Sequence, residues 1–170
     1  LSAIDTVVFD KTGTLTQSHP EVAEILSVNP EKYTREDILR LSACLEEHFP
    51  HPVAKAVVRC AEERDLRHAE EHTEVEYVVA HGIASLWRGK RVLLGSRHYL
   101  CQDEGIDVSI MGSEIERLSR NGYSLLYLAV DGALEGIIAM EDPVRPESAA
   151  LIRCLGELGI SHVMMLTGDD

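Results

Sequence analysis

The sequence predicts an α/β domain with a Rossmann-type parallel sheet, interrupted by an inserted α+β domain built on an antiparallel sheet. Two short apolar runs, 4–8 and 162–166, are each followed by a polar turn that contains glycine. Such runs are typical of buried strands. Between them the pattern changes to alternating strands and pairs of amphipathic helices. We therefore expect residues 1–17 and 140–170 to form the parallel-sheet domain and residues 18–139 to form the insert.

The composition indicates a globular protein with an acidic surface. Of the 170 residues, 45% are hydrophobic, which is enough for a core, and the formal net charge is −13. This charge argues against binding to nucleic acid or to an anionic membrane surface. No apolar run reaches the roughly 18 residues of a membrane span, and no secretory signal is visible. The cysteines are scattered, which predicts reduced thiols and no metal site among Cys44, Cys60, Cys101 and Cys154.

The first half of the insert predicts one strand followed by two helices. Residues 21–28 alternate in part, and Asn29-Pro30 ends the strand. Thr34 begins a pattern close to a capping box, and the apolar spacing after it predicts a helix to residue 46 or 47. Pro52 suits the first turn of a second helix, which the charged stretch 62–74 ends.

The second half of the insert is expected to be mainly antiparallel strands. A meander is predicted over residues 75–80, 83–87 and 91–94. The dipeptide Asp131-Gly132 is a strong hairpin signal, and it joins the predicted strands 124–130 and 133–140.

Three further helices are expected outside this first helical pair. Ser96 can cap a short helix over 97–101, and a longer helix is predicted over 108–120. The inward residues of the longer helix are predicted to be Ile110, Ile115 and Leu118. The last helix starts near Pro146 and ends at Gly159, with a predicted core face of Leu151, Ile152, Leu155 and Leu158.

A polar motif, Asp10-Lys11-Thr12-Gly13-Thr14-Leu15-Thr16, directly follows the first strand. In open α/β sheets, ligands are held in the crevice beyond the carboxyl ends of the strands. Asp10 is therefore placed to attack a phosphoryl group, which would give an aspartyl phosphate. Lys11 and the threonine hydroxyls can hold anionic oxygens, and Gly13 lets backbone N–H groups approach a phosphate.

The complete motif resembles the phosphorylation motif of the P-type ATPases, ion pumps that form an aspartyl phosphate. Thr167-Gly168-Asp169 resembles the second motif of their phosphorylation domain, with Asp170 where Asn is usual. The resemblance implies a partial haloacid dehalogenase-like (HAD-like) fold for the parallel-sheet domain. It also implies Mg²⁺ held by Asp10 and Thr12, and a catalytic set of Asp10, Lys11, Thr12, Thr167, Gly168 and Asp169.

A second group of residues is similar to the nucleotide-binding domain of the heavy-metal-transporting P-type ATPases. Glu46 and His51 match the pair that holds the adenine end of ATP in that family. Gly82 matches the second glycine of a Gly-x-Gly bend that lets the nucleotide lie against bare backbone, and Gly95 matches the glycine of a Gly-Asn pair that follows. The chain departs from the family pattern at Pro50, Ala80 and Ser96.

Asp142-Pro143-Val144-Arg145 resembles the segment by which the chain of these pumps re-enters the phosphorylation domain. In the family an Asp and a basic residue of this segment contact the ribose and phosphate of the nucleotide, which implies this role for Asp142 and Arg145. A helix N-terminus with Asp142 as its cap fits the same residues nearly as well.

The resemblance implies the ATP-binding and phosphorylation region of a pump for heavy-metal cations, with ATP and Mg²⁺ as cofactors. The implied partners are the transported cation and the actuator and transmembrane domains of the same chain, with no nucleic acid. The region is expected to be a soluble piece on the cytoplasmic side of an integral membrane protein, ending inside the phosphorylation domain. It is expected to bind ATP without turnover.

Two alternatives stay open from the sequence. One is a soluble phosphohydrolase of the same HAD-like fold, although such enzymes usually carry a second Asp where this chain has Thr12. The other is a nucleotide-binding module without catalysis, which would bind nucleotide and transfer no phosphoryl group.

Overall fold

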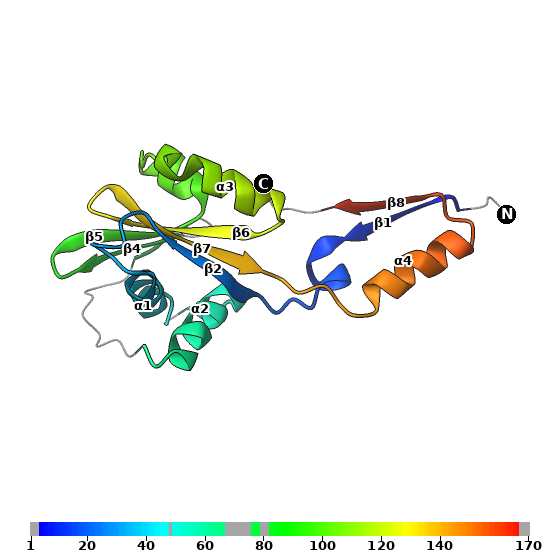
Figure 1. Ribbon diagram of the computed structural model, residues 1–170, viewed down its shortest axis with the longest axis horizontal. Helices are drawn as coiled ribbons and strands as arrows, with labels where there is room; N and C mark the ends of the chain where they lie inside the picture. The colour runs from blue at the N-terminus through cyan, green and yellow to red at the C-terminus, as the bar shows by residue number, and fades with distance from the viewer. Residues whose placement is uncertain (1–3, 48, 67–75, 79–81, 167–170) are drawn as a thin grey trace. The chain divides into compact units, whose positions relative to one another are not determined.

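The computed structural model describes residues 4–47, 49–66, 76–78 and 82–166. It divides into two compact units, one of residues 1–20 and 142–170 and the other Glu21–Glu141 (Figure 1). The unit boundaries lie two or three residues beyond those expected from the sequence, because Glu21 and Glu141 are still paired in the sheet of the larger unit.

The larger unit is built on a six-stranded antiparallel sheet with the strand order β2-β7-β6-β5-β4-β3 (Figure 1). The strands are β2 (Glu21–Ser27), β3 (Glu76–Val78), β4 (Gly82–Trp87), β5 (Lys90–Gly95), β6 (Ser124–Val130) and β7 (Ala133–Glu141). Asp131 and Gly132 both have positive φ, as the tight turn between β6 and β7 requires. The predicted antiparallel α+β architecture is confirmed.

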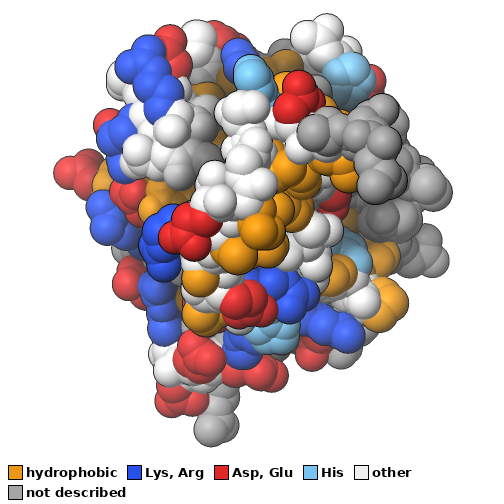
Figure 2. Space-filling model, turned by 90° about the vertical axis from the view of Figure 1, so that its right-hand side faces the viewer, with side chains coloured by type: hydrophobic (Ala, Val, Ile, Leu, Met, Phe, Trp, Pro, Cys, Tyr) orange, Lys and Arg blue, Asp and Glu red, His pale blue; other side chains and the backbone are white. Residues whose placement is uncertain are grey.

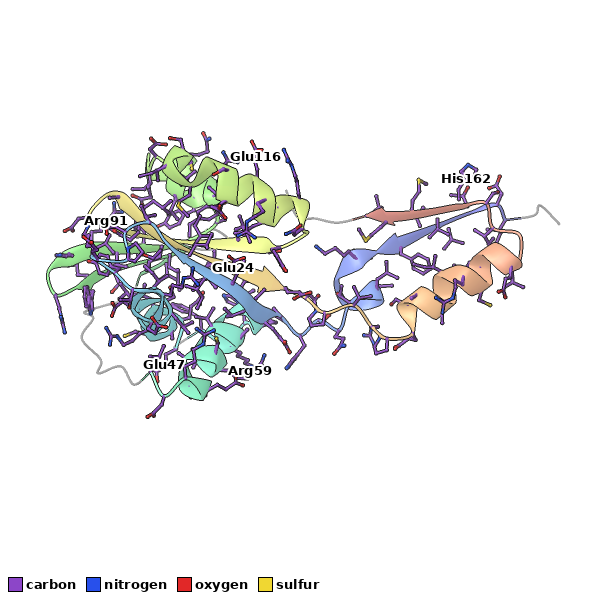
Figure 3. All side chains as sticks on the ribbon, in the orientation of Figure 1. Glu24, Glu47, Arg59, Arg91, Glu116 and His162 are labelled. Atoms are coloured by element: carbon purple, nitrogen blue, oxygen red, sulfur yellow. The ribbon has the colours of Figure 1, made fainter. Side chains whose placement is uncertain are left out.

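Helices cover both faces of this sheet, so the unit has two apolar layers. Helices α1 (Arg35–Glu46) and α2 (Pro52–Glu63) pack on one face, against Ile83, Leu94 and Ile138 among others. A helical turn (Tyr99–Asp103) and α3 (Gly112–Arg120) pack on the other face. The strand neighbours of the three residues just named point to that face; they are Ala84, Leu93 and Ile137. Figure 3 shows side chains filling the space on both sides of the sheet.

The starts of α1 and α2 are fixed by side-chain caps. Thr34 Oγ1 accepts a hydrogen bond from Asp37 N at 3.1 Å, and Thr34 N donates to Asp37 Oδ2 at 3.0 Å. This reciprocal pair is the predicted capping box. At α2 the cap is His51, whose Nδ1 accepts from Ala54 N at 3.4 Å, and Pro52 follows as the first helical residue.

The described part of the smaller unit contains a parallel pair of strands, a helical turn and one helix. Strand β1 (Thr6–Asp10) pairs with β8 (His162–Leu166), and the register places Asp10 opposite Leu166. A helical turn over Lys11–Leu15 follows β1, and α4 (Ser148–Glu157) precedes β8. The predicted parallel pairing is therefore confirmed, with α4 beginning two residues after Pro146.

The predicted core positions of the smaller unit and of the 108–120 helix are partly wrong. Leu151, Ile152 and Leu158 are 45%, 39% and 74% exposed, because the described part of this unit offers only two strands for α4 to pack on. Hydrophobic side chains are accordingly open on the face shown in Figure 2. Ile110 is 69% exposed, because it lies in the turn Ser109–Met111 that precedes α3. Ile115 and Leu118 are buried as predicted.

Nothing in the described ranges resembles a membrane span, since none of their helices combines sufficient length with sufficient apolar character.

Candidate functional site

The Asp10 motif forms an exposed strand end followed by a tight turn. Asp10 is the last residue of β1, and its side chain is exposed. The chain then coils through Lys11–Leu15, and Thr16 N closes the turn by donating to Lys11 O at 3.2 Å. Gly13 needs its left-handed φ of +81°, and a Cβ at this position would lie 2.6 Å from Ser18 Oγ. The local sequence thus explains why glycine stands at this point.

The second predicted catalytic segment follows the neighbouring strand. Asp10 and Leu166 are register partners at the carboxyl ends of β1 and β8. Thr167, Gly168 and Asp169 come directly after Leu166 but lie outside the described residues. The described residue that precedes this segment, Leu166, therefore lies beside Asp10.

The hydroxyl of Thr16 lies at the centre of the hydrogen bonds in this turn. Thr16 is only 3% exposed, and its Oγ1 lies 2.5 Å from Asp142 Oδ2. Oγ1 also accepts from Gly13 N at 3.0 Å and lies 3.2 Å from Lys11 O. A hydroxyl carries a single proton, and the short contact to the carboxylate is the stronger of its two acceptors. The other carboxylate oxygen, Asp142 Oδ1, accepts from His19 N at 3.1 Å.

Arg145 and Ser148 hold the carbonyl groups of the same turn. Arg145 Nε donates to Thr16 O at 2.9 Å and its Nη2 donates to Gly13 O at 3.2 Å. Leu15 O accepts from Arg145 N and from Ser148 Oγ, both at 2.9 Å. Helix α4 has Glu147 at its N-cap and no side-chain cap bond, so the alternative of Asp142 as helix cap is wrong.

The structure brings Glu46 and His51 together at the junction of α1 and α2. Glu46 Oε2 lies 3.6 Å from His51 Nε2, with Glu46 3% exposed and the His51 side chain 43% exposed. Glu47, labelled in Figure 3, marks this end of α1. His51 Nδ1 accepts the backbone N–H of Ala54, so the neutral ring carries its proton on Nε2, which faces the carboxyl.

Burial shifts the proton affinity of both groups toward their neutral forms. It raises the pKa of the Glu46 carboxyl from its ordinary value of 4.5 to about 7. Burial also lowers the pKa of the His51 imidazole below its ordinary value of 6.5. Glu46 Oε2 accepts no hydrogen bond from any described residue. At 3.6 Å, His51 Nε2 lies beyond hydrogen-bond distance of Glu46 Oε2. This buried oxygen can therefore accept a hydrogen bond from a ligand that carries an N–H group and reaches it past the half-exposed His51 ring.

Gly82 and Gly95 are also brought together, as register partners on β4 and β5. A Cβ on Gly82 would lie 2.4 Å from Leu94 O and 2.6 Å from Tyr99 Cδ1, so the close approach of these groups requires glycine. The Cβ position of Gly82 points toward Tyr99, in the apolar layer opposite α1 and α2, because its neighbour Ile83 packs in the cluster under those helices. Ala80 lies outside the described residues.

Ser96, which stands where the family has Asn, has a structural task. Its Oγ accepts from Tyr99 N at 3.2 Å and so caps the following helical turn, as the sequence predicts. Pro50 lies exposed in the short connection before α2.

Two described groups of the motif are candidate metal ligands, and both offer oxygen atoms. The Asp10 carboxylate and the Thr12 carbonyl belong to one strand end and its turn. Hard oxygen donors of this kind suit Mg²⁺. Within the described ranges, no group of three or more His, Cys, Asp or Glu side chains is arranged to hold a metal ion.

The sequence analysis counted Thr16 among the threonines whose hydroxyls could hold anionic oxygens and missed its hydrogen bond to Asp142. Its partner Asp142 is 126 residues away, so neighbouring residues in the chain cannot reveal the contact. One sequence feature could have indicated a buried role for Thr16, namely a hydroxyl residue at the end of the motif, directly after the apolar Leu15.

Comparison with known proteins places the whole chain in one family. A family model described as haloacid dehalogenase-like hydrolase matches residues 4–170. The manganese-exporting P-type ATPase of Mycobacterium bovis is 41% identical over 98% of this chain and 23% of its own length. The chain thus spans about a quarter of the length of this curated relative.

Two solved structures resemble the chain as well. A zinc-transporting PIB-type ATPase in its E2·Pi state has a TM-score of 0.71 at 28% identity, over 96% of this chain and 25% of that one. The N-domain of HMA6, a copper-transporting P-type ATPase, has a TM-score of 0.56 at 26% identity, over 72% of this chain and 99% of that one. The chain therefore belongs to the haloacid dehalogenase-like hydrolases, and its relatives there are P-type ATPases of heavy metals.

Proposed function

We propose that this chain is the ATP-binding and phosphorylation region of a P-type ATPase that pumps a heavy-metal cation across a membrane. The observation that carries the proposal is the exposed carboxylate of Asp10, at the carboxyl end of β1 and opposite the end of β8. The relatives support a heavy-metal cation as the cargo, and their names include manganese, zinc and copper.

The two units are proposed to correspond to two domains of such a pump. The unit Glu21–Glu141 would be the nucleotide-binding domain, which the likeness to a solved N-domain over 72% of this chain supports. The unit of residues 1–20 and 142–170 would belong to the phosphorylation domain. The remaining partners would be the actuator and transmembrane domains of the same chain, with this region on the cytoplasmic side.

The proposed reaction is a phosphoryl transfer from ATP to Asp10. A carboxylate oxygen of Asp10 attacks the γ-phosphorus in line, and the bond to the β–γ bridging oxygen breaks, so that ADP leaves with the electron pair. The Lys11 ammonium and Thr167, Gly168 and Asp169 would hold the oxygens of the transferring group. Asp10 and the Thr12 carbonyl would hold Mg²⁺, which neutralises phosphate charge when bound.

The proposed adenine site is the pair of Glu46 and His51. The exocyclic amino group of adenine can donate to Glu46 Oε2, which has no donor among the described residues, and the half-exposed His51 ring can lie against the base. Gly82 and Gly95, register partners on β4 and β5, are proposed to contribute to the same nucleotide site on the strength of the family resemblance, because Leu94 O and Tyr99 already occupy the space beside Gly82.

The decisive experiment is phosphorylation of an ATPase that contains this segment with radiolabelled ATP. The wild type should give an acid-stable, hydroxylamine-sensitive adduct, and Asp10→Asn should abolish it because the amide is not nucleophilic. Asp5→Asn is the matched control, since Asp5 is an exposed carboxylate of the same unit. Undiminished labelling of Asp10→Asn would refute the assignment.

The 170-residue chain alone is expected to bind ATP and to release no phosphate in a Mg²⁺-dependent manner. Phosphate release and ATP affinity should be measured on one sample. Sustained hydrolysis would favour the phosphohydrolase alternative. Binding without any labelling of the longer ATPase would favour the nucleotide-binding module.

A further inference from the structure

We propose that Thr16, Asp142 and Arg145 form a clasp that positions the turn behind Asp10, and that Asp142 and Arg145 act through this turn instead of contacting nucleotide. The kinetic consequences of the clasp rest on the proposed function of Asp10. The contacts themselves do not depend on that function.

The clasp secures the turn on both its N–H and its carbonyl groups. Thr16 Oγ1 accepts Gly13 N at 3.0 Å, and Thr16 N donates to Lys11 O at 3.2 Å. Arg145 donates from its side chain to Gly13 O and Thr16 O. Gln17 N donates to Pro143 O at 2.9 Å, which extends the pairing between the two segments. The conformation of the turn therefore depends on a segment more than 120 residues further along the chain.

The polar atoms of Asp142 and Arg145 are already engaged within the turn. Both carboxylate oxygens of Asp142 accept hydrogen bonds, Oδ2 from Thr16 Oγ1 and Oδ1 from His19 N. Arg145 uses Nε and Nη2 on backbone carbonyls, and its Nη1 lies 3.9 Å from Glu147 Oε1. Turning these groups toward a ribose hydroxyl or a phosphate would break charge-assisted bonds that hold the turn.

Asp10 immediately precedes the turn, so the clasp controls where the nucleophile lies. A charge-assisted bond to a 3% exposed hydroxyl is a rigid anchor, because burial shields this hydroxyl from water. Displacement of a reacting group by about 1 Å costs on the order of 10²-fold in rate. We expect loss of the Thr16 hydroxyl to slow phosphoryl transfer and to leave ATP affinity nearly unchanged.

The test compares Thr16→Val, Thr16→Ser and Asp142→Asn in the ATPase that contains this segment. At saturating ATP, Thr16→Val and Asp142→Asn should each slow phosphoenzyme formation by about 10- to 100-fold, with ATP affinity within about twofold of the wild type. Thr16→Ser keeps the hydroxyl and should restore most of the rate. Thr6→Val is the matched control, because among the described residues the Thr6 hydroxyl bonds to the adjacent Asp5 and not to the turn.

Two results would overturn the clasp. One is a tenfold loss of ATP affinity in Asp142→Asn with normal kinetics in Thr16→Val, which is the pattern of a ribose contact. The other comes from amide hydrogen exchange on the 170-residue chain, where Thr16→Val should speed exchange at Gly13 and not across β6. Unchanged exchange at Gly13 would show that the Thr16 hydroxyl does not hold this N–H group. If the wild-type ATPase forms no phosphoenzyme, the proposed function fails, while the exchange experiment still decides whether the clasp exists.

Discussion

Replacing Glu46 by glutamine should change how the stability of the larger unit depends on pH. Glu46 is buried, its pKa is raised to about 7, and its Oε2 has no hydrogen-bond donor among the described residues. Glutamine has nearly the same shape and stays neutral at every pH. Glu46→Gln therefore removes the titration while it preserves the packing.

The sign follows from proton binding in the two states. Between pH 4.5 and 7 the folded state holds a proton on Glu46 that the unfolded state has released, so the wild type loses stability as pH rises through this range. The difference between 4.5 and about 7 corresponds to about 3 kcal/mol of the free energy of unfolding. Relative to the wild type, Glu46→Gln should gain up to this amount by pH 8, compared with pH 4.5.

The assay is urea unfolding of both proteins at several pH values between 4.5 and 8, followed by circular dichroism. His51 acts in the opposite direction, because its lowered pKa makes the folded state more stable as pH rises through the region just below 6.5. Glu62→Gln, at an exposed carboxyl of α2, is the control. Parallel pH curves for Glu46→Gln and the wild type would refute the assignment of a buried, proton-binding carboxyl.

Three further changes test the larger unit. His51→Ala should weaken ATP binding about 5- to 30-fold by titration calorimetry, with the exposed His98→Ala as control. Gly82→Ala should lower the free energy of unfolding by about 1–3 kcal/mol, because its Cβ would lie 2.4 Å from a backbone oxygen of β5. Gly112→Ala meets no neighbour and should not lower it. Thr34→Ala removes the cap of α1 and should cost about 1 kcal/mol in urea unfolding, with no loss disproving the cap.

Signals from residues close together in sequence were enough to predict most helices and turns of the larger unit. Thr34 marks the start of α1 because its cap partner is three residues away, and Asp131-Gly132 marks the hairpin because both residues tolerate positive φ. The strand order could not be predicted, because β2 pairs with β7 across the whole insert and neither strand encodes its partner locally.

In the candidate site too, the features set by neighbouring residues could be predicted, whereas those set by distant residues could not. Asp10 was predictable as a carboxylate at a strand end, since the apolar strand and the polar turn are contiguous in sequence. The burial of Glu46 was not, because a glutamate at a helix end is usually exposed. The partners of Asp142 could not be predicted either, since they come from a turn at the opposite end of the chain. The exposure of Leu151 shows that an apolar helix face predicts burial only where a second layer lies against it.

The pairing of Glu21 with Glu141 also bears on the order in which the chain folds. Before the insert folds, joining β1 to β8 closes a loop of about 150 residues, and afterwards the paired ends of the insert shorten it to about 40. Because closure entropy grows with the logarithm of loop length, this shortening favours the parallel pair by about 1 kcal/mol. The folded insert thus stabilises the pairing of β1 with β8, and mutations that unfold the insert should weaken the pairing of the strand that carries Asp10.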